Sequence, residues 1–184
     1  GRRMIFFDGG MGTLLQANGL KAGELPELWN LQRPELIESI HRQYLEAGAD
    51  LIKTNTFGAN RIKLQGSGHS AEEIVSAAVR LAKKAAAGSE TPVTMDIGPT
   101  GKLMKPVAGE KAGADLILIE TMGDTLECKA AVLAAKENTS LPVFATMIVD
   151  ETGRLLTGGD IPAFVALLEG LGVDALGLNC GFGP

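Results

Sequence analysis

The stretch Ala112-Gly113-Ala114-Asp115-Leu116-Ile117 recurs along the chain and decides its fold. Ala47-Gly48-Ala49-Asp50-Leu51-Ile52 and Leu171-Gly172-Val173-Asp174-Ala175-Leu176 follow the same pattern. In each copy a glycine ends a helix, and an apolar run then begins a buried strand. This succession is typical of repeated βα units around a parallel sheet, so the sequence predicts an α/β fold.

The rest of the chain supplies matching elements. Apolar runs predict six strands, over residues 4–7, 51–55, 93–96, 116–120, 143–148 and 175–179. Amphipathic stretches between them predict helices that begin at Pro34, Ser70, Asp124 and Asp160. Ser70 with Glu73 and Asp124 with Glu127 have the spacing of capping boxes. Residues 98–101, Gly-Pro-Thr-Gly, predict a loop.

Near-identical successive units favour a closed (β/α)8 barrel over an open doubly wound sheet, although a barrel needs two more strands. Only about ten residues separate Gly101 from Ala112, whereas a crossover with its helix needs at least a dozen. We therefore expect a single domain over 1–184, an incomplete (β/α)8 TIM barrel of about six strands. It lacks the last two units and one crossover helix. Its unpaired edges would promote aggregation or pairing.

The composition excludes several classes of protein. The chain has 184 residues, 45% of them hydrophobic, and a formal net charge of −5. A nucleic-acid or anionic-membrane surface would need clustered Lys and Arg, which are absent. The sequence contains no run of about 18 apolar residues, which a membrane-spanning helix would need, and its first residues do not have the pattern of a signal peptide. Two cysteines cannot make a disulfide framework, so we expect a cytoplasmic protein.

Polar residues follow the predicted strands at their C-terminal ends, where βα barrels build their active sites. They are Asp8, Asn55, Thr56, Asp96, Glu120, Thr121, Asn179 and Cys180, with Met147 the apolar exception. Asp8 and Glu120 would point into one mouth, where they could bind an ammonium group or act as acid and base. Asp8 before Gly9-Gly10 could equally be a turn residue that caps the next amides.

Two other features each allow two interpretations. Gly9, Gly10 and Gly12 permit close backbone approach to a carboxylate or phosphate, or simply form a turn; they match neither a dinucleotide fingerprint nor a P-loop. Lys53 could form a Schiff base, as strand lysines of barrel aldolases do, or it could be a paired interior charge.

The cysteines and histidines differ in their expected positions. Cys180 ends a strand in the mouth and could be a nucleophile or a metal ligand, although zinc would need two or three further N or S ligands that the chain does not supply nearby. Cys128 lies mid-helix among alanines and is expected to pack. His41 and His69 are expected to be surface or capping residues of the outer layer.

Six ordered motifs then identify a family. They are Phe7-Asp8-Gly9-Gly10-Met11-Gly12-Thr13, Pro26-Glu27-Leu28-Trp29-Asn30, Thr54-Asn55-Thr56-Phe57-Gly58-Ala59-Asn60, Asp96-Ile97-Gly98-Pro99-Thr100-Gly101, Ile119-Glu120-Thr121 and Gly177-Leu178-Asn179-Cys180. Through nearly its whole length the chain resembles the homocysteine S-methyltransferase domain family, and within it the N-terminal homocysteine-binding module of cobalamin-dependent methionine synthases.

The resemblance implies a (β/α)8 barrel in which Cys180 is one of three cysteine ligands to zinc. The other two would form an adjacent pair, which this sequence lacks. It also implies that Asp8 and Glu120 hold the amino group of homocysteine. The amides around Gly9 and Gly10, with the region of Thr56 and Asn179, would shape the amino-acid pocket. No catalytic residue is expected beyond the zinc site.

The implied reaction suits a thiol substrate. A thiol with a pKa of about 8.5 is mostly protonated at neutral pH, and zinc would stabilise the thiolate that attacks an activated methyl group. We expect methylcobalamin, supplied by another domain, as the donor, with folate- and cobalamin-binding domains of the same or another chain as partners. Alternatives are betaine or S-methylmethionine as donor, an inactive fragment, and a Schiff-base lyase that uses Lys53.

Overall fold

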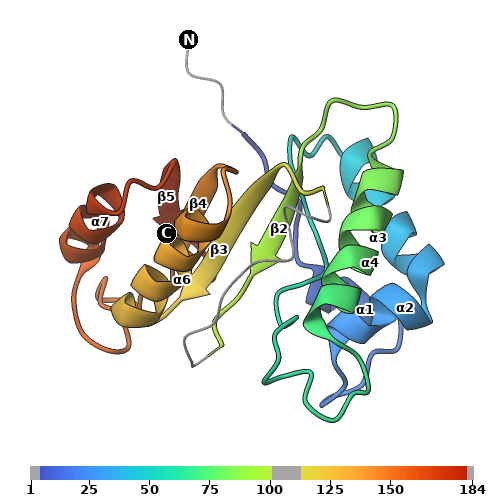
Figure 1. Cartoon of the computed structure of the whole chain (residues 1–184), viewed down its shortest axis with the longest axis horizontal. Coiled ribbons are helices and arrows are strands. Elements are labelled where there is room, and N and C mark those ends of the chain that lie inside the picture. The colour runs from blue at the N-terminus through green and yellow to red at the C-terminus, as the bar shows by residue number, and fades with distance from the viewer. Residues whose placement is uncertain (1–4, 101–112, 182–184) are drawn as a thin grey trace.

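The computed structural model describes residues 5–100 and 113–181. Its centre is a five-stranded parallel sheet in which the strands lie side by side in chain order (Figure 1). The strands are β1 (Ile52–Lys53), β2 (Val93–Ile97), β3 (Leu116–Met122), β4 (Val143–Met147) and β5 (Ala175–Leu178). Sequential parallel order is what successive βα units produce, and it agrees with the predicted α/β class.

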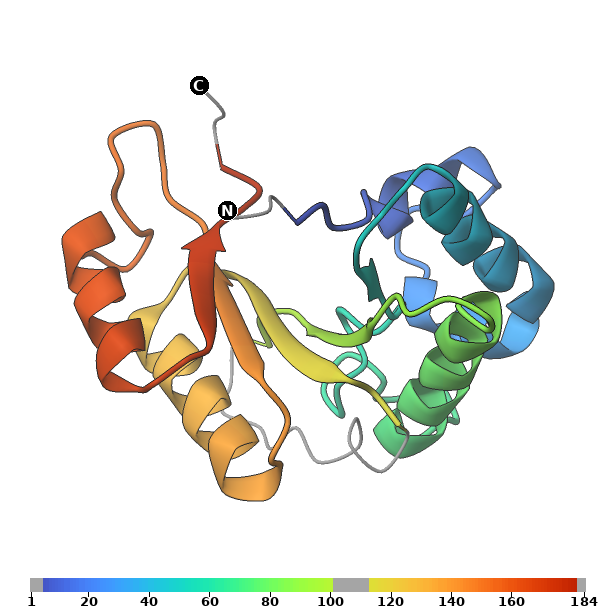
Figure 2. The same cartoon turned by 90° about the horizontal axis from the view of Figure 1, so that it is seen from above.

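Helices flank the sheet at both ends. One group comprises α1 (Met11–Ala17), the 3-10 helix η1 (Pro26–Leu28), α2 (Trp29–Gln32), α3 (Pro34–Glu46) and α4 (Ala71–Ala85); the other comprises α6 (Thr125–Asn138) and α7 (Ile161–Gly170). Figure 2 shows the two groups on opposite sides, with the strands between them. Within residues 5–100 and 113–181, no helix is long and apolar enough to cross a membrane.

The expected helix caps are confirmed. Ser70 accepts a hydrogen bond from the Glu73 amide at 3.1 Å, and Asp124 accepts one from the Glu127 amide at 2.7 Å. Asp160 likewise accepts from the amide three residues later, at 3.0 Å. Each bond satisfies an N–H that the first turn leaves without a helical partner, which fixes where α4, α6 and α7 begin.

The aspartate of the repeat joins each strand to its predecessor. The Asp115 amide donates to the Val93 carbonyl at 2.9 Å, and the Asp115 carboxylate accepts from the Val93 amide at 2.6 Å. Asp174 exchanges the same two bonds with Val143, at 2.8 Å each, and Asp50 exchanges them with Phe6. The repeat therefore sets the register of neighbouring strands as well as ending helices.

The two faces of the sheet differ in character. The helix-covered face forms the main core, where α4, α6 and α7 pack on β2 to β4; Val79, Ile119, Val132, Val143 and Phe164 are among its buried residues. The opposite face carries a smaller cluster of Leu51, Leu116 and Leu118, against which Phe144 packs. Polar side chains continue this second face toward the C-terminal ends of the strands.

Several expectations need correction. Residues 5–100 and 113–181 contain five strands rather than six, because the described part of the first apolar run pairs through a single bridge between Phe7 and Leu51. β1 is also shorter than predicted. The short helices α1, η1 and α2 were not predicted, since none carries a long apolar stripe. The missing crossover helix was placed within 101–112, which lies outside the described residues. Closure into a barrel is not seen in the described part.

The expectation for His41 is wrong. Its side chain lies in the middle of α3 and is fully buried, with both ring nitrogens unpartnered. Burial lowers the pKa of His41 to about 4. The polar ring fits among the helices because a neutral imidazole is tolerated where an imidazolium is not. His69 does lie beside a helix start, where Nδ1 is 3.0 Å from Glu73. Cys128 is buried in the core as expected.

Candidate active site

Three charged residues from separate elements meet on the face opposite the main core. Asp8 follows the first run, Lys53 ends β1 and Glu120 lies in β3. The Lys53 Nζ is 3.3 and 3.4 Å from the two Glu120 oxygens, and the Lys53 backbone amide donates to Asp8 Oδ2 at 2.8 Å. The structure therefore brings together Asp8 and Glu120, as the sequence predicted, through a lysine that stands between them.

A fourth charge completes this cluster. Asp96 lies on β2 between β1 and β3, is 5% exposed, and interacts electrostatically with Lys53, Glu120 and Asp8. Burial, and next the charge of Glu120, raises the pKa of Asp96 well above its ordinary value. One oxygen of Asp96 and one of Asp8 are buried without a hydrogen-bond partner. Sequence reasoning placed Asp96 at a strand end but left it out of the pocket.

Burial also shifts the other charges of the cluster. It raises the pKa of Asp8 to about 6, against an opposing effect of the Lys53 amide and ammonium. Burial alone would lower the pKa of Lys53, but the combined charges of Glu120, Asp96 and Asp8 outweigh it and raise that pKa. Lys53 therefore stays protonated. A Schiff-base nucleophile needs a free amine, so this environment does not favour that role.

Asn179 connects the carboxylates to the sulfur of Cys180. Its Nδ2 lies 3.2 Å from Glu120 Oε2, 2.8 Å from Thr121 Oγ1 and 3.6 Å from Cys180 Sγ. Its Oδ1 accepts from the Thr121 amide and from the Thr146 hydroxyl, which fixes the orientation of the amide. Thr146 was missed from the sequence. The signal was its place on β4, opposite Gly177, on the same face as Asn179.

The backbone is strained at this point. Among the described residues, the non-glycine positions with positive φ are Thr121, at 63°, and Cys180, at 54°. Their side chains approach one another, with Thr121 Oγ1 3.9 Å from Cys180 Sγ. The ladder between β3 and β4 also shifts register between Ile119 and Met122. Strain and bulges of this kind cluster at functional sites, where they direct side chains that a regular strand would point elsewhere.

Thr56 is less open to a ligand than expected. It is 3% exposed, and its hydroxyl donates to the Asp96 carbonyl at 2.7 Å. The Thr54 hydroxyl lies 2.6 Å away and accepts from the Asp96 amide. These bonds hold the backbone of Asp96 in place, so Thr56 supports the wall of the pocket.

Gly9 and Gly10 lie exposed directly after Asp8. A Cβ at Gly9 would stand 2.8 Å from the Tyr44 hydroxyl, which itself donates to the Gly10 carbonyl at 3.4 Å. A side chain at position 9 would therefore displace the Tyr44 ring. The close approach predicted for this segment is therefore made by Tyr44, and it fixes the turn that presents Asp8.

Cys180 is exposed at the end of β5, as expected for a residue in the mouth. Zinc needs four ligands in a structural site and three protein ligands in a catalytic one. Within the described ranges, no group of three or more His, Cys, Asp or Glu side chains is arranged to hold a metal ion. The described residues therefore offer one exposed thiol, Cys180, and do not form a zinc site by themselves.

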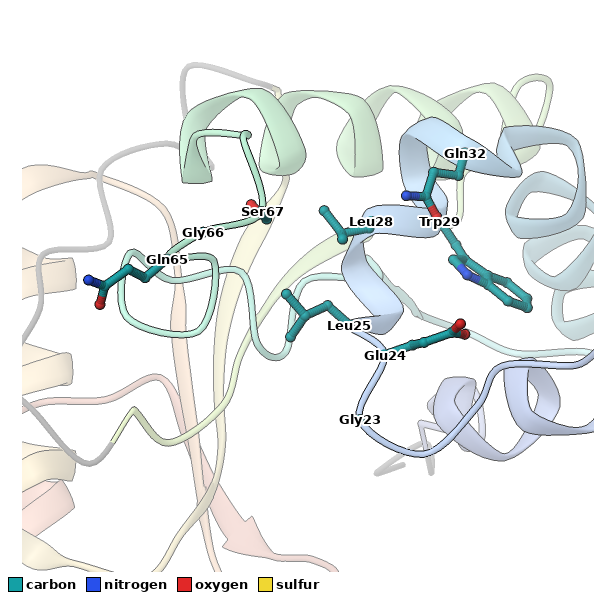
Figure 3. A pocket seen from close by; sticks show the side chains of 9 residues that line it. All are labelled: Gly23, Glu24, Leu25, Leu28, Trp29, Gln32, Gln65, Gly66 and Ser67. Carbon is teal, nitrogen blue, oxygen red and sulfur yellow. The ribbon is translucent and has the colours of Figure 1, made fainter.

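A separate cavity of about 340 Å³ lies away from these residues. Figure 3 shows Leu25 and Leu28 pointing toward the loop that carries Gly66 and Ser67. The other lining residues are Gly23, Glu24, Trp29, Gln32 and Gln65. Asp8, Glu120 and Cys180 do not line it. Because no titratable groups converge there, the polar strand ends are the better candidate for chemistry.

Known proteins share this arrangement of sequence and fold. The model of the homocysteine S-methyltransferase family matches residues 5–184. Methionine synthases of Mycobacterium leprae and Mycobacterium tuberculosis are 37% and 36% identical over the whole chain. The chain spans 18% of the length of each of these relatives.

The structural comparison agrees. The metallated form of the homocysteine methyltransferase MmuM from Escherichia coli superposes with a TM-score of 0.82 at 26% sequence identity, covering 97% of this chain and 75% of that one. Its apo form gives a TM-score of 0.77 at the same identity and covers 97% of this chain and 73% of that one. The match of the family model over nearly the full chain decides the assignment, and the chain belongs to the homocysteine S-methyltransferase family.

Proposed function

We propose that this chain carries the homocysteine-binding part of an enzyme that transfers a methyl group to the homocysteine thiol and so forms methionine. One observation carries the proposal: the Asn179 amide contacts both the Glu120 carboxylate and the Cys180 sulfur, at 3.2 and 3.6 Å. An acidic group and a thiol on either side of one residue suit a small substrate that carries an ammonium group at one end and a thiol at the other.

Each pocket residue has a role in this proposal. Asp8 and Glu120 hold the substrate ammonium, and the backbone around Gly9 and Gly10 receives its carboxylate. Asn179, fixed by Thr146, orients Glu120 and directs the sulfur toward Cys180, while Thr56 maintains the wall at Asp96. Two carboxylates at a partly buried site bind an ammonium more strongly than water-exposed ones would.

We further propose Cys180 as one ligand of a zinc ion; the adjacent cysteine pair that would complete the site is absent from this sequence. The metallated form of MmuM supports metal binding in a related protein. The proposed donor is methylcobalamin on another domain, with folate- and cobalamin-binding domains as partners. The much greater length of the related methionine synthases is consistent with such further domains. Two unpaired cysteines suit the reducing cytoplasm, where we place the protein.

The domain itself is proposed to be part of a (β/α)8 barrel over 1–184. Large apolar side chains are exposed at both margins of the sheet: Ile5, Phe6 and Phe7 at one, Leu176 and Leu178 at the other. Further βα units would cover them and pair the open edges. The alignment with the Mycobacterium leprae protein runs over 218 positions, 34 more than the 184 residues of this chain. The Mycobacterium leprae protein therefore contains residues that have no counterpart in this chain.

Binding of L-homocysteine to the Glu120→Ala variant tests the proposal by calorimetry. We expect at least a tenfold loss of affinity, because the ammonium loses a partly buried partner, and the same unfolding midpoint within a few degrees. Glu137→Ala, at an exposed position of α6, is the matched control. Wild-type affinity in Glu120→Ala would remove this residue from the pocket. In a longer form of the protein that carries the cysteine pair and binds zinc, undiminished zinc content in Cys180→Ser would refute the ligand assignment.

A further inference from the structure

Lys53 joins the two carboxylates that the proposed function assigns to the substrate ammonium. Its main chain binds Asp8 and its side chain reaches both oxygens of Glu120. Resting on that function, we propose that the Lys53 ammonium occupies the substrate ammonium subsite in the free protein and leaves Glu120 when homocysteine binds. Lys53 would then set the affinity and selectivity of the pocket.

The geometry supports an occupant that can be displaced. Lys53 Nζ approaches Glu120 at 3.3 and 3.4 Å, longer than the 2.7–2.9 Å of strong charge-assisted bonds. By contrast, Lys84 and Glu38 on the surface approach to 2.6 Å. The side chains of Lys53 and Glu120 are 19% and 12% exposed, so the pair is partly shielded and yet reachable from solvent. A primary ammonium of the substrate could make the same contacts.

The cluster also holds more acceptors than its own cation can satisfy. Asp8, Asp96 and Glu120 surround one ammonium, and Asp8 Oδ1 and Asp96 Oδ1 are buried without partners. These two side chains are more than nine-tenths buried; Asp96 belongs to β2, beside Lys53, and Asp8 follows Phe7, which bridges to Leu51 on the other side. The cluster therefore has hydrogen-bonding capacity that Lys53 alone does not use. Lys53 can turn to Asp96 on the neighbouring strand and keep a carboxylate partner throughout the exchange.

An opposite role for Lys53 is conceivable on chemical grounds, since a lysine can hold the substrate carboxylate. The two roles predict changes of opposite sign when the charge is removed. A displaced competitor lowers affinity, so its removal strengthens binding. A carboxylate ligand raises affinity, so its removal weakens binding. The composition of the cluster favours the first role, because three carboxyl groups surround a single ammonium.

The test is calorimetric binding of L-homocysteine to the full 184-residue chain as wild type, Lys53→Met and Lys53→Gln. We expect binding to tighten roughly fivefold in both variants, the gain from releasing one partly exposed ion pair. Lys84→Met, which removes a surface lysine paired with Glu38, should leave the affinity unchanged. 4-Mercaptobutanoate, which is homocysteine without its amino group, should bind Lys53→Met and wild type with the same affinity.

Each other outcome decides the matter. Unchanged or weaker homocysteine binding in both folded Lys53 variants overturns the displacement proposal and leaves the proposed function standing. Tighter binding of 4-mercaptobutanoate as well would also overturn it, because the gain would not involve the ammonium. No homocysteine binding by wild type or any variant overturns the proposed function, and this inference falls with it. Circular dichroism of each variant verifies folding.

Discussion

Asp8→Asn should make the protein more stable at alkaline pH, although Asp8 belongs to the proposed pocket. Burial raises the pKa of Asp8 from 3.8 to about 6. The folded protein therefore holds this proton more tightly than the unfolded chain, and ionisation of Asp8 costs stability as pH rises from 3.8 to 6. A pKa shift of this size lowers the free energy of unfolding by about 3 kcal/mol at pH 8 and by about 1 kcal/mol at pH 4.5.

Urea unfolding measures this cost, with the fluorescence of Trp29, the single tryptophan, as the signal. The stability of Asp8→Asn minus that of wild type should be about 2 kcal/mol larger at pH 8 than at pH 4.5. Asp150→Asn is the control of opposite sign, because hydrogen bonds from Arg154 and Thr152 lower the pKa of Asp150. A difference for Asp8→Asn that does not change with pH would show that burial does not raise the pKa of Asp8.

Two further perturbations test the framework around the site. His41→Leu should abolish a loss of about 2.5 kcal/mol in the free energy of unfolding between pH 8 and 4.5, because burial lowers the folded pKa of His41 to about 4 and only the unfolded chain takes up the proton just below 6.5. Urea titrations at both pH values measure this loss, and the control His69→Gln should retain it. An unaltered loss in His41→Leu would contradict the assignment. Asp174→Ala should lower stability by about 1 kcal/mol, because it removes the 2.8 Å hydrogen bond from the Val143 amide. Asp174→Asn keeps an acceptor and should lose less stability. Equal losses in the two variants would show that this hydrogen bond contributes nothing.

Much of the fold followed from local signals. The repeat of glycine, aspartate and apolar run predicted the starts of β1, β3 and β5, and the caps at Ser70 and Asp124 predicted α4 and α6. The short elements escaped prediction because their stability is tertiary. α2, for example, has only four residues, and it is held by the burial of Trp29 and Asn30. Likewise, nothing around His41 in the sequence shows that it is fully buried in the folded protein.

The candidate site was predicted in part. Strand ends gave Asp8, Glu120, Asn179 and Cys180, because the C-terminal ends of parallel strands meet at one edge. The contact of Lys53 with Glu120 could not be predicted from the sequence. Lys53 is on β1 and Glu120 on β3, so their contact depends on the register of both strands with β2, which lies between them. The role of Asn179 as a bridge was equally hidden. It depends on the positive φ values of Thr121 and Cys180, and neither residue type indicates such a backbone conformation in a sequence.

The most direct test of the central claim is a crystal structure of the full chain bound to L-homocysteine. Ligand density is expected at the C-terminal ends of β1 to β5. Its ammonium should lie within hydrogen-bond distance of Asp8 and Glu120, with its sulfur directed to Cys180. Density instead in the cavity beside Trp29, with the polar strand ends unchanged, would contradict it.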